Sequence, residues 1–130
     1  WRNTWSLQFF DRTWRPGFLS VVDSSVSDTL RAPDPLPDGI WSLVAATRDS
    51  ATGKVRLYVD GVAVDSATRP GALDYRSIAP VNLPLFLGAN FIGVLDEIRV
   101  SAVARSPSWI ALDHLLQRPG SRAIHYRRIP

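Results

Sequence analysis

The sequence predicts an all-β protein: an antiparallel β-sandwich (jelly roll) with one short C-terminal helix. Three observations predict this fold class. Short apolar runs recur between turn residues, and 10 prolines and 8 glycines in 130 residues favour many turns over long helices. Several of these runs alternate apolar and polar side chains, which is the period of a half-buried strand. Helical spacing of apolar residues occurs in one stretch, without the strand–helix–strand alternation of a parallel sheet.

The first hairpin is expected near the N-terminus. TWSLQFFD (4–11) alternates as a strand, Pro16-Gly17 marks a turn, and FLSVVD (18–23) reads as the returning strand. A weaker strand is expected within residues 24–32. The prolines of residues 33–37 cannot donate to a ladder, so they predict a rigid loop. One face of the first strand carries Trp5, Leu7 and Phe9.

The most regular stretch is WSLVAATRDSATGKVRLYVDGVAVDS (41–66), which predicts two consecutive hairpins. The first loop is built around Thr52-Gly53. The second is the pair Asp60-Gly61, which suits a two-residue turn because Gly tolerates positive φ. On the strand between the two loops, Val55, Leu57 and Val59 should share one face, and Arg56, Tyr58 and Asp60 the other.

Two further strands and the helix are expected towards the C-terminus. VNLPLFLGAN (81–90) and FIGVLDEIRVS (91–101) are rich in large apolar residues on both faces, as in a covered sheet. Ser106 is a good N-cap, and Pro107 suits the first helical position because its missing N–H would be unpaired there. Pro119-Gly120 should end the helix. Its apolar face, expected to dock on the sandwich, consists of Trp109, Leu112 and Leu116.

Length and charge place one domain at residues 1–117, followed at 118–130 by a basic tail or edge strand. The tail holds four arginines and no acidic residue, within a formal net charge of +3. A solvated linker is favoured over a nucleic-acid contact for this tail. No apolar run approaches the roughly 20 residues of a membrane span. The chain has no Met and opens with Trp1, which predicts an excised or processed piece.

The ordered motifs of residues 37–117 resemble a known family. They are IWSLVAATRDSATGKVRLYVDGVAVDS, then LPLFLGANFIGVLDEIRVSAVARSPSWI. This order is similar to the laminin-G-like jelly rolls of the concanavalin A-like lectin/glucanase superfamily, often found in bacterial secreted and surface proteins. The resemblance implies a secreted or cell-surface location. It also implies an N-terminally incomplete domain, because such domains usually begin earlier. Another polypeptide, or a second copy, would then complete the sandwich edge beside residues 4–11.

The residues do not predict an enzyme. Glucanases of that superfamily place two Glu and an Asp on alternating positions of one strand, the arrangement that retaining hydrolysis requires. The chain has a single Glu, Glu97. Its two histidines, His114 and His125, have no nearby Ser–Asp pattern of a nucleophilic triad.

Asp96 is the most informative polar residue. On a regular strand it shares a face with Ile98 and Val100, so its carboxylate must be paired, hydrogen-bonded or metal-bound. The resemblance implies a structural Ca²⁺ here, because related glucanases use the similar Asp for calcium. Backbone N–H groups or an Arg are the favoured alternative.

Trp14 is the candidate for sugar binding. It lies in the polar context DRTWRPG, and an exposed aromatic ring beside Arg is a typical stacking surface for a glycan, whereas Trp5 is expected in the core. Two functions therefore follow. The first is a recognition or structural module in a protein–protein assembly, such as an extracellular filament or fibre. The alternative is a carbohydrate-binding module.

Overall fold

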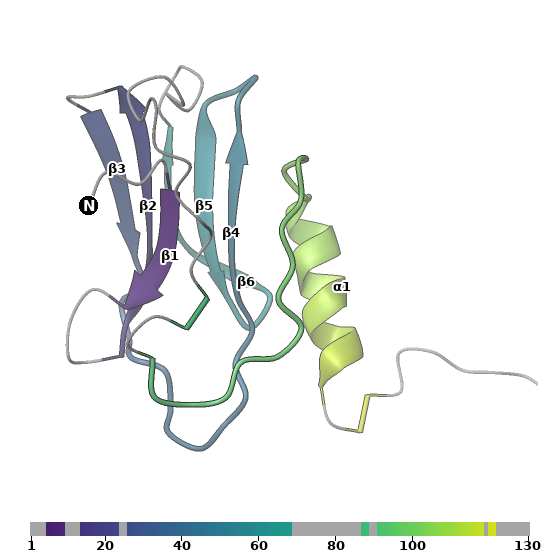
Figure 1. Cartoon of the computed structure of the whole chain (residues 1–130). Helices are drawn as coiled ribbons and strands as arrows, with labels where there is room; N and C mark the ends of the chain where they lie inside the picture. The colour runs from purple at the N-terminus through teal and green to yellow at the C-terminus, as the bar shows by residue number, and fades with distance from the viewer. Residues whose placement is uncertain are drawn as a thin grey trace, which may run out of the picture.

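The structure is a computed structural model that describes residues 5–9, 14–23, 26–68, 87–88, 91–118 and 120–121. Within these residues, six strands form two three-stranded antiparallel sheets, and one helix follows (Figure 1). The predicted all-β sandwich with one short helix is confirmed. The first sheet is ordered β1 (Trp5–Phe9), β2 (Pro16–Asp23), β3 (Val26–Arg31). The second is ordered β4 (Val44–Asp49), β5 (Lys54–Val59), β6 (Val62–Thr68), and the helix is α1 (Pro107–Gln117).

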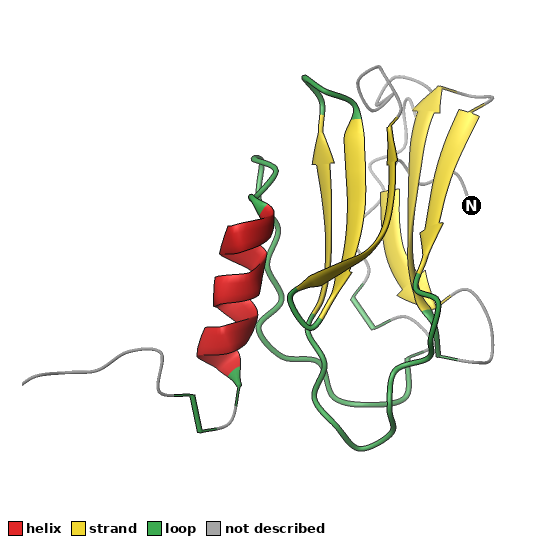
Figure 2. Ribbon diagram, turned by 180° about the vertical axis from the view of Figure 1, so that it is seen from behind, coloured by secondary structure: helices red, strands yellow, loops and turns green. Residues whose placement is uncertain are grey.

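The core lies between the two sheets, whose strands run nearly in line (Figure 2). Phe18 and Leu30 of the first sheet form one buried cluster with Val55 and Leu57 of the second. Each such side chain contributes about 1.5–3 kcal/mol when it is fully buried. The Arg31 N–H donates to Asp65 Oδ2 at 2.9 Å, which ties β3 to β6.

The two hairpins predicted for residues 41–66 are confirmed. Lys54–Val59 pairs with Val44–Asp49 on one side and with Val62–Thr68 on the other. At the second turn, Asp60 has φ 50° and Gly61 has φ 81°. Positive φ at both central residues defines the turn type whose twist matches that of the flanking strands.

The turn predicted at Pro16-Gly17 is wrong, because both residues open β2. Pro16 pairs with Phe9, and Gly17 lies between Gln8 and Arg31 in the sheet. Proline is tolerated at the first position of a strand, where its missing N–H removes no ladder bond. The weaker strand predicted within residues 24–32 is present as β3.

The strand predicted at residues 91–101 is also wrong. They belong to residues 91–105, which we call the arc. The arc passes below the sheets and then rises beside α1 (Figures 1 and 2). A strand needs a neighbour to satisfy its backbone groups, and none of the described strands pairs with the arc. The strand predicted at 81–90 lies outside the described residues except for 87–88, as does most of the tail 118–130.

The predicted helix is confirmed from its cap onwards. Ser106 Oγ accepts the Trp109 N–H at 3.1 Å, and Pro107 occupies the first turn. The predicted docking face is wrong, because Ile110, 5% exposed, is the buried residue of α1. None of the helices in the described part of the chain has the length and apolar character needed to cross a membrane.

Candidate functional site

The arc and α1 carry most of the exposed large apolar side chains among the described residues. Ten of the sixteen exposed large apolar side chains among the described residues belong to residues 92–116. Monomeric proteins rarely leave large contiguous apolar patches in water, so such a surface indicates an interaction site. We refer to these ten residues as the C-terminal apolar surface: Ile92, Val94, Leu95, Ile98, Val100, Val103, Trp109, Leu112, Leu115 and Leu116.

The arc has few internal restraints. Between residues 92 and 103, the described chain makes two backbone hydrogen bonds, both to neighbouring side chains. The Glu97 N–H donates to Asp96 Oδ1 at 2.8 Å, and the Val103 N–H donates to Ser101 Oγ at 3.4 Å. Backbone groups that make no bond within the described chain are available as donors and acceptors to a further strand.

Arg99 holds the arc against α1. Its guanidinium donates to Glu97 Oε2 and to Asp113 Oδ1, each at 2.7 Å. These two hydrogen bonds, with Glu97 the larger cause, raise the pKa of Arg99 above its usual value. The Asp113 side chain is 14% exposed and that of Glu97 54%, so the bond to Asp113 is the better shielded from water.

The helix packs against the β5–β6 turn. The side that packs there is opposite the apolar stripe of α1, which consists of Trp109, Leu112 and Leu116. A Cβ at Gly61 would lie 3.1 Å from both Ala111 Cα and His114 Cβ, so α1 approaches the β5–β6 turn closely there. His114 Nδ1 lies 3.8 Å from Asp60 Oδ1. A helix turns about 100° per residue, so Ile110, Ala111 and His114 share a side. Turned away from the sheet are Trp109, Leu112 and Leu116.

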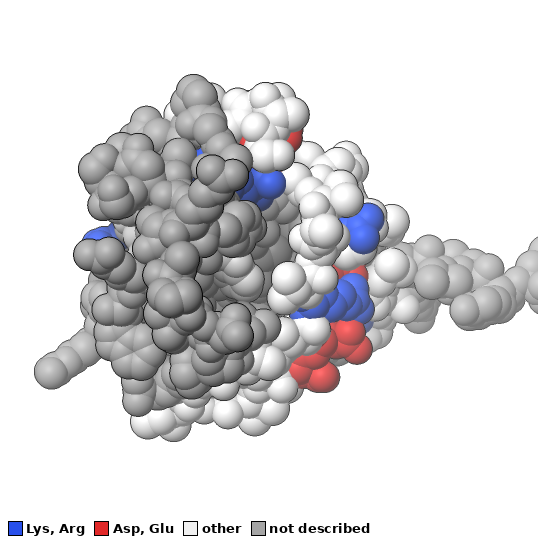
Figure 3. Space-filling model, turned by 45° about the horizontal axis from the view of Figure 1, so that its top comes forward, with Lys and Arg blue, Asp and Glu red and all other residues white. Residues whose placement is uncertain are grey.

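Basic side chains lie at both ends of the apolar stripe. The Arg105 guanidinium lies 5.0 Å from the Trp109 ring centroid, a cation–π contact at the start of α1, and Arg118 is the residue at its C-cap. Elsewhere on the face seen in Figure 3, the described basic and acidic side chains lie beside one another rather than in a field of one sign.

Trp14 belongs to an aromatic cluster that joins three segments. Its ring meets Phe9 edge-on at 5.5 Å and Phe91 at 6.1 Å, and the two Phe rings stack at 5.8 Å. Trp14 is 40% exposed, so part of the indole is accessible to a ligand. Its use as a sugar-binding residue stays a prediction.

The backbone of Trp14 is strained and anchors a loop. Its φ is 58°, a conformation that bulky residues rarely adopt. Its carbonyl accepts the Leu36 N–H at 3.1 Å, and the Pro16 carbonyl accepts the Ala32 N–H at 2.8 Å. These bonds fix the start of residues 33–41, which we call the proline loop.

Asp96 does not occupy the predicted strand face. Its carboxylate is exposed and accepts the N–H of Glu97, whose φ is 51°, so it stabilises a local turn. No group of three His, Cys, Asp or Glu side chains able to hold a metal ion occurs in the described part of the chain. Asp96 as a calcium ligand stays a prediction.

Glu97 and Asp49, two acidic side chains of the described residues, are engaged in local bonds. Glu97, the single Glu of the chain, accepts a hydrogen bond from Arg99. The acidic turn at Asp49 is structural: its carboxylate accepts the Ala51 N–H at 3.0 Å and the Thr52 hydroxyl at 2.6 Å. These bonds, that of Thr52 first, lower the pKa of Asp49.

Sequence reasoning missed three features of these surfaces. Phe91 joins Phe9 and Trp14 although it lies far from both in sequence, and no local signal brings it there. Arg99 binds Asp113 of α1 in addition to Glu97, which is two residues away in the sequence. Ile40 and Trp41 are exposed, 66% and 62%, beside acidic loop residues.

Comparison with known proteins supports the fold. The family model of the concanavalin A-like lectin/glucanases superfamily matches residues 2–111. An S-layer domain-containing protein from Clostridium thermocellum has a solved structure with TM-score 0.47 and 17% sequence identity, over 77% of this chain and 51% of that one. The chain therefore spans about half the length of that structure. No curated protein matches the chain.

Proposed function

The chain belongs to the concanavalin A-like lectin/glucanase superfamily, and from this premise we propose that it is a non-catalytic module of a secreted or surface-exposed bacterial protein. Its role is protein–protein assembly, as in an extracellular filament or fibre. Laminin-G-like domains are generally non-catalytic, and the single Glu of the chain, Glu97, is bound to Arg99.

The observation that carries the proposal is the C-terminal apolar surface. Its members range from 38% exposed at Trp109 to 86% at Ile92. Covering one such side chain contributes up to about 1.5–3 kcal/mol to the free energy of binding. A partner that covers several of them therefore binds with a large favourable free energy. Protein partners present the apolar and aromatic side chains that match such a surface.

A second feature supports assembly. β1 is an edge strand that pairs with β2 alone among the described strands, and its Leu7 and Gln8 are exposed. An open edge offers backbone donors and acceptors to a further strand. We propose that another polypeptide, or a copy of this chain, completes the sandwich at this edge.

Hydrogen–deuterium exchange on the whole chain tests the proposal. Amides of residues 92–103, and those amides of residues 5–9 that do not bond to β2, should exchange quickly at low protein concentration and become protected as concentration rises, because an interface excludes water. The β5 amides, already in the centre of a sheet, serve as the internal control. Fast exchange in both segments at every concentration, with β5 protected throughout, would refute assembly through these surfaces.

Carbohydrate binding is the second candidate, and the exposed part of the Trp14 indole favours it. Trp14→Ala should abolish binding on a glycan array with a small change in melting temperature, because the ring is only partly covered by Phe9 and Phe91. Trp41→Ala, which removes another exposed indole, is the matched control and should keep the binding. Absent binding in the wild type, or a large loss of stability in Trp14→Ala, would remove this candidate.

A further inference from the structure

We infer that the outer face of α1 docks onto the proline loop (residues 33–41) of a second copy of this chain. The inference rests on the proposed assembly function and names its partner. Both surfaces are exposed, both carry large apolar side chains, and their flanking charges have opposite sign.

The α1 side of the contact is apolar with basic ends. Trp109, Leu112 and Leu116 form the stripe, 38%, 50% and 40% exposed. Arg105 precedes its first turn and Arg118 follows its last. The acidic residue of α1, Asp113, is occupied by Arg99 and is mostly buried, so it does not offset these two charges.

The loop side is apolar with acidic flanks. Ile40 and Trp41 are 66% and 62% exposed, and two exposed carboxylates, Asp34 and Asp38, precede them. Prolines alternate through residues 33–37 and fix φ, while the Leu36 N–H is held by the Trp14 carbonyl. A loop that is already rigid loses little conformational entropy when it binds.

Charge complementarity selects a second copy in this arrangement. If two α1 stripes met in an antiparallel pair, Arg105 would face Arg118. The proline loop instead brings Asp34 and Asp38 towards arginines and an indole towards the Leu stripe. Opposite charges across an interface fix register and suppress wrong partners.

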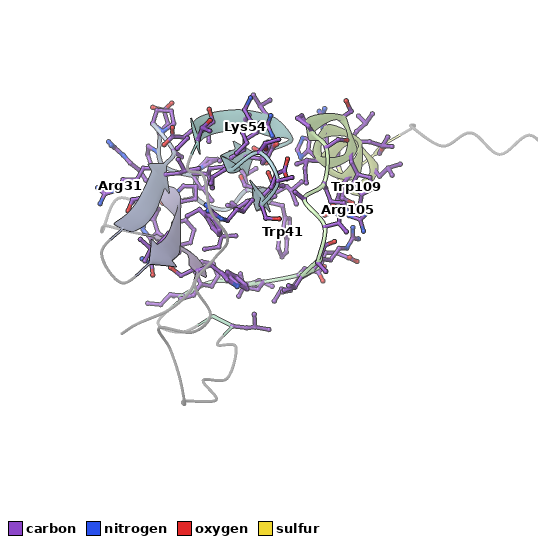
Figure 4. All side chains as sticks on the ribbon, turned by 90° about the horizontal axis from the view of Figure 1, so that it is seen from above. Arg31, Trp41, Lys54, Arg105 and Trp109 are labelled. Carbon is purple, nitrogen blue, oxygen red and sulfur yellow. The ribbon has the colours of Figure 1, made fainter. Side chains whose placement is uncertain are left out.

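The two surfaces occupy different places on one molecule. Figure 4 places Arg105 and Trp109 at α1, and Trp41 on the sheet side of the arc of residues 91–105. A contact between unlike surfaces is heterologous, so each copy keeps one free surface of each kind. Such contacts propagate into a ring or an open filament.

Complementation between two variants tests the contact by sedimentation velocity on the whole chain. Leu112→Asp keeps the loop and loses the stripe, whereas Trp41→Asp keeps the stripe and loses the loop. Both replaced side chains are half-exposed or more, so the fold should persist, which circular dichroism and melting temperature check. Ser50→Asp, exposed in the β4–β5 turn, is the control for an added charge.

Each single variant should raise the dissociation constant of self-association about tenfold or more. The equimolar mixture should form a heterodimer and stop there, because one partner keeps only the loop and the other only the stripe. Ser50→Asp should associate as the wild type does. A mixture that stays as weak as its components would overturn the inference.

The other outcomes separate the inference from the function on which it rests. If both single variants associate as strongly as the wild type, the α1–loop contact is wrong and assembly occurs elsewhere. If the wild type stays monomeric, self-association fails as a whole: the α1–loop contact is wrong, and the partner at the β1 edge is another polypeptide and not a copy of this chain. Wild-type protein that stays monomeric but sediments with phosphatidylglycerol vesicles would overturn the inference in favour of an anionic lipid surface.

Discussion

Tyr58 is the penultimate residue of β5, and its fully buried side chain lies on the face opposite Val55 and Leu57. Its hydroxyl is buried without a hydrogen-bond partner among the described residues. A buried hydroxyl that lacks a partner has lost its hydration and gained nothing in exchange. The ring therefore stabilises the fold, and the oxygen does not.

Tyr58→Phe should accordingly unfold at the same urea concentration as the wild type or at a higher one. Removal of an unpaired hydroxyl changes the free energy of unfolding by about 0 to +1 kcal/mol. Tyr58→Ala is the control and should lose about 3–5 kcal/mol, because it leaves a cavity in place of the ring. A loss of more than about 1 kcal/mol in Tyr58→Phe would reveal a partner for the hydroxyl.

Asp49 makes the stability of the β4–β5 turn pH-dependent. Its pKa is lowered in the folded protein by the Thr52 hydroxyl and then by the Ala51 N–H. A lowered folded-state pKa contributes stability above the unfolded value near about 3.9, and that contribution disappears as pH falls through the folded value. Asp49→Asn should therefore melt below the wild type at pH 7, and the gap should close in acid.

Thr52→Val distinguishes the pH effect of Asp49 from that of the other acidic residues, because it removes the hydroxyl that lowers the pKa of Asp49 most. Combined with Asp49→Asn, it should change the pH dependence of melting little further. A gap between Asp49→Asn and the wild type that stays constant from neutral pH into acid would contradict the assignment.

At the scale of elements, α1 depends on the absence of a side chain at Gly61. An added Cβ would meet Ala111 Cα and His114 Cβ at 3.1 Å, and φ is +81°. Gly61→Ala should lower the melting temperature and loosen the helix from the β5–β6 turn. The quantities to measure are the melting temperature and the helical circular dichroism signal.

Gly39→Ala is the matched control for backbone strain. Its φ is +71°, and nothing lies within 4 Å of an added Cβ. Left-handed backbone in a residue other than Gly costs about 1–2 kcal/mol. Gly61→Ala should lose more than this control because it adds a steric clash, and equal losses would show that the approach of α1 is not restrictive.

The elements that the sequence predicted are those with local signals. The turn at Asp60-Gly61 and the cap at Ser106 each depend on residues adjacent in the chain. The turn predicted at Pro16-Gly17 was wrong because proline occurs both at the start of a strand and in turns. The strand predicted at residues 91–101 was wrong for a different reason. The apolar pattern of these residues suits a strand, but a strand also requires a neighbouring strand, which no local pattern provides.

The candidate surfaces were harder to predict than the fold. Trp14 was identified as partly exposed from its polar neighbours, but its contacts with Phe9 and Phe91 depend on how three segments meet. The α1 stripe was recognised as apolar, and its outward direction was not. Period alone cannot distinguish a face that packs on its own sheet from one left for a partner.

At the scale of the whole molecule, burial and exposure are unevenly distributed. The two sheets enclose a core centred on Phe18, Leu30, Val55 and Leu57, while the arc and α1 carry most of the exposed large apolar side chains of the described residues. Large apolar side chains exposed in such number have a cost in water that assembly removes. This unevenness is the physical basis of the proposed role.

Sedimentation velocity of the whole chain between about 1 and 100 µM tests that role most directly. The account predicts a weight-average sedimentation coefficient that rises with concentration, and a smaller rise in Leu112→Asp at the same concentrations. A folded wild type whose sedimentation coefficient stays at the monomer value throughout this range would contradict it.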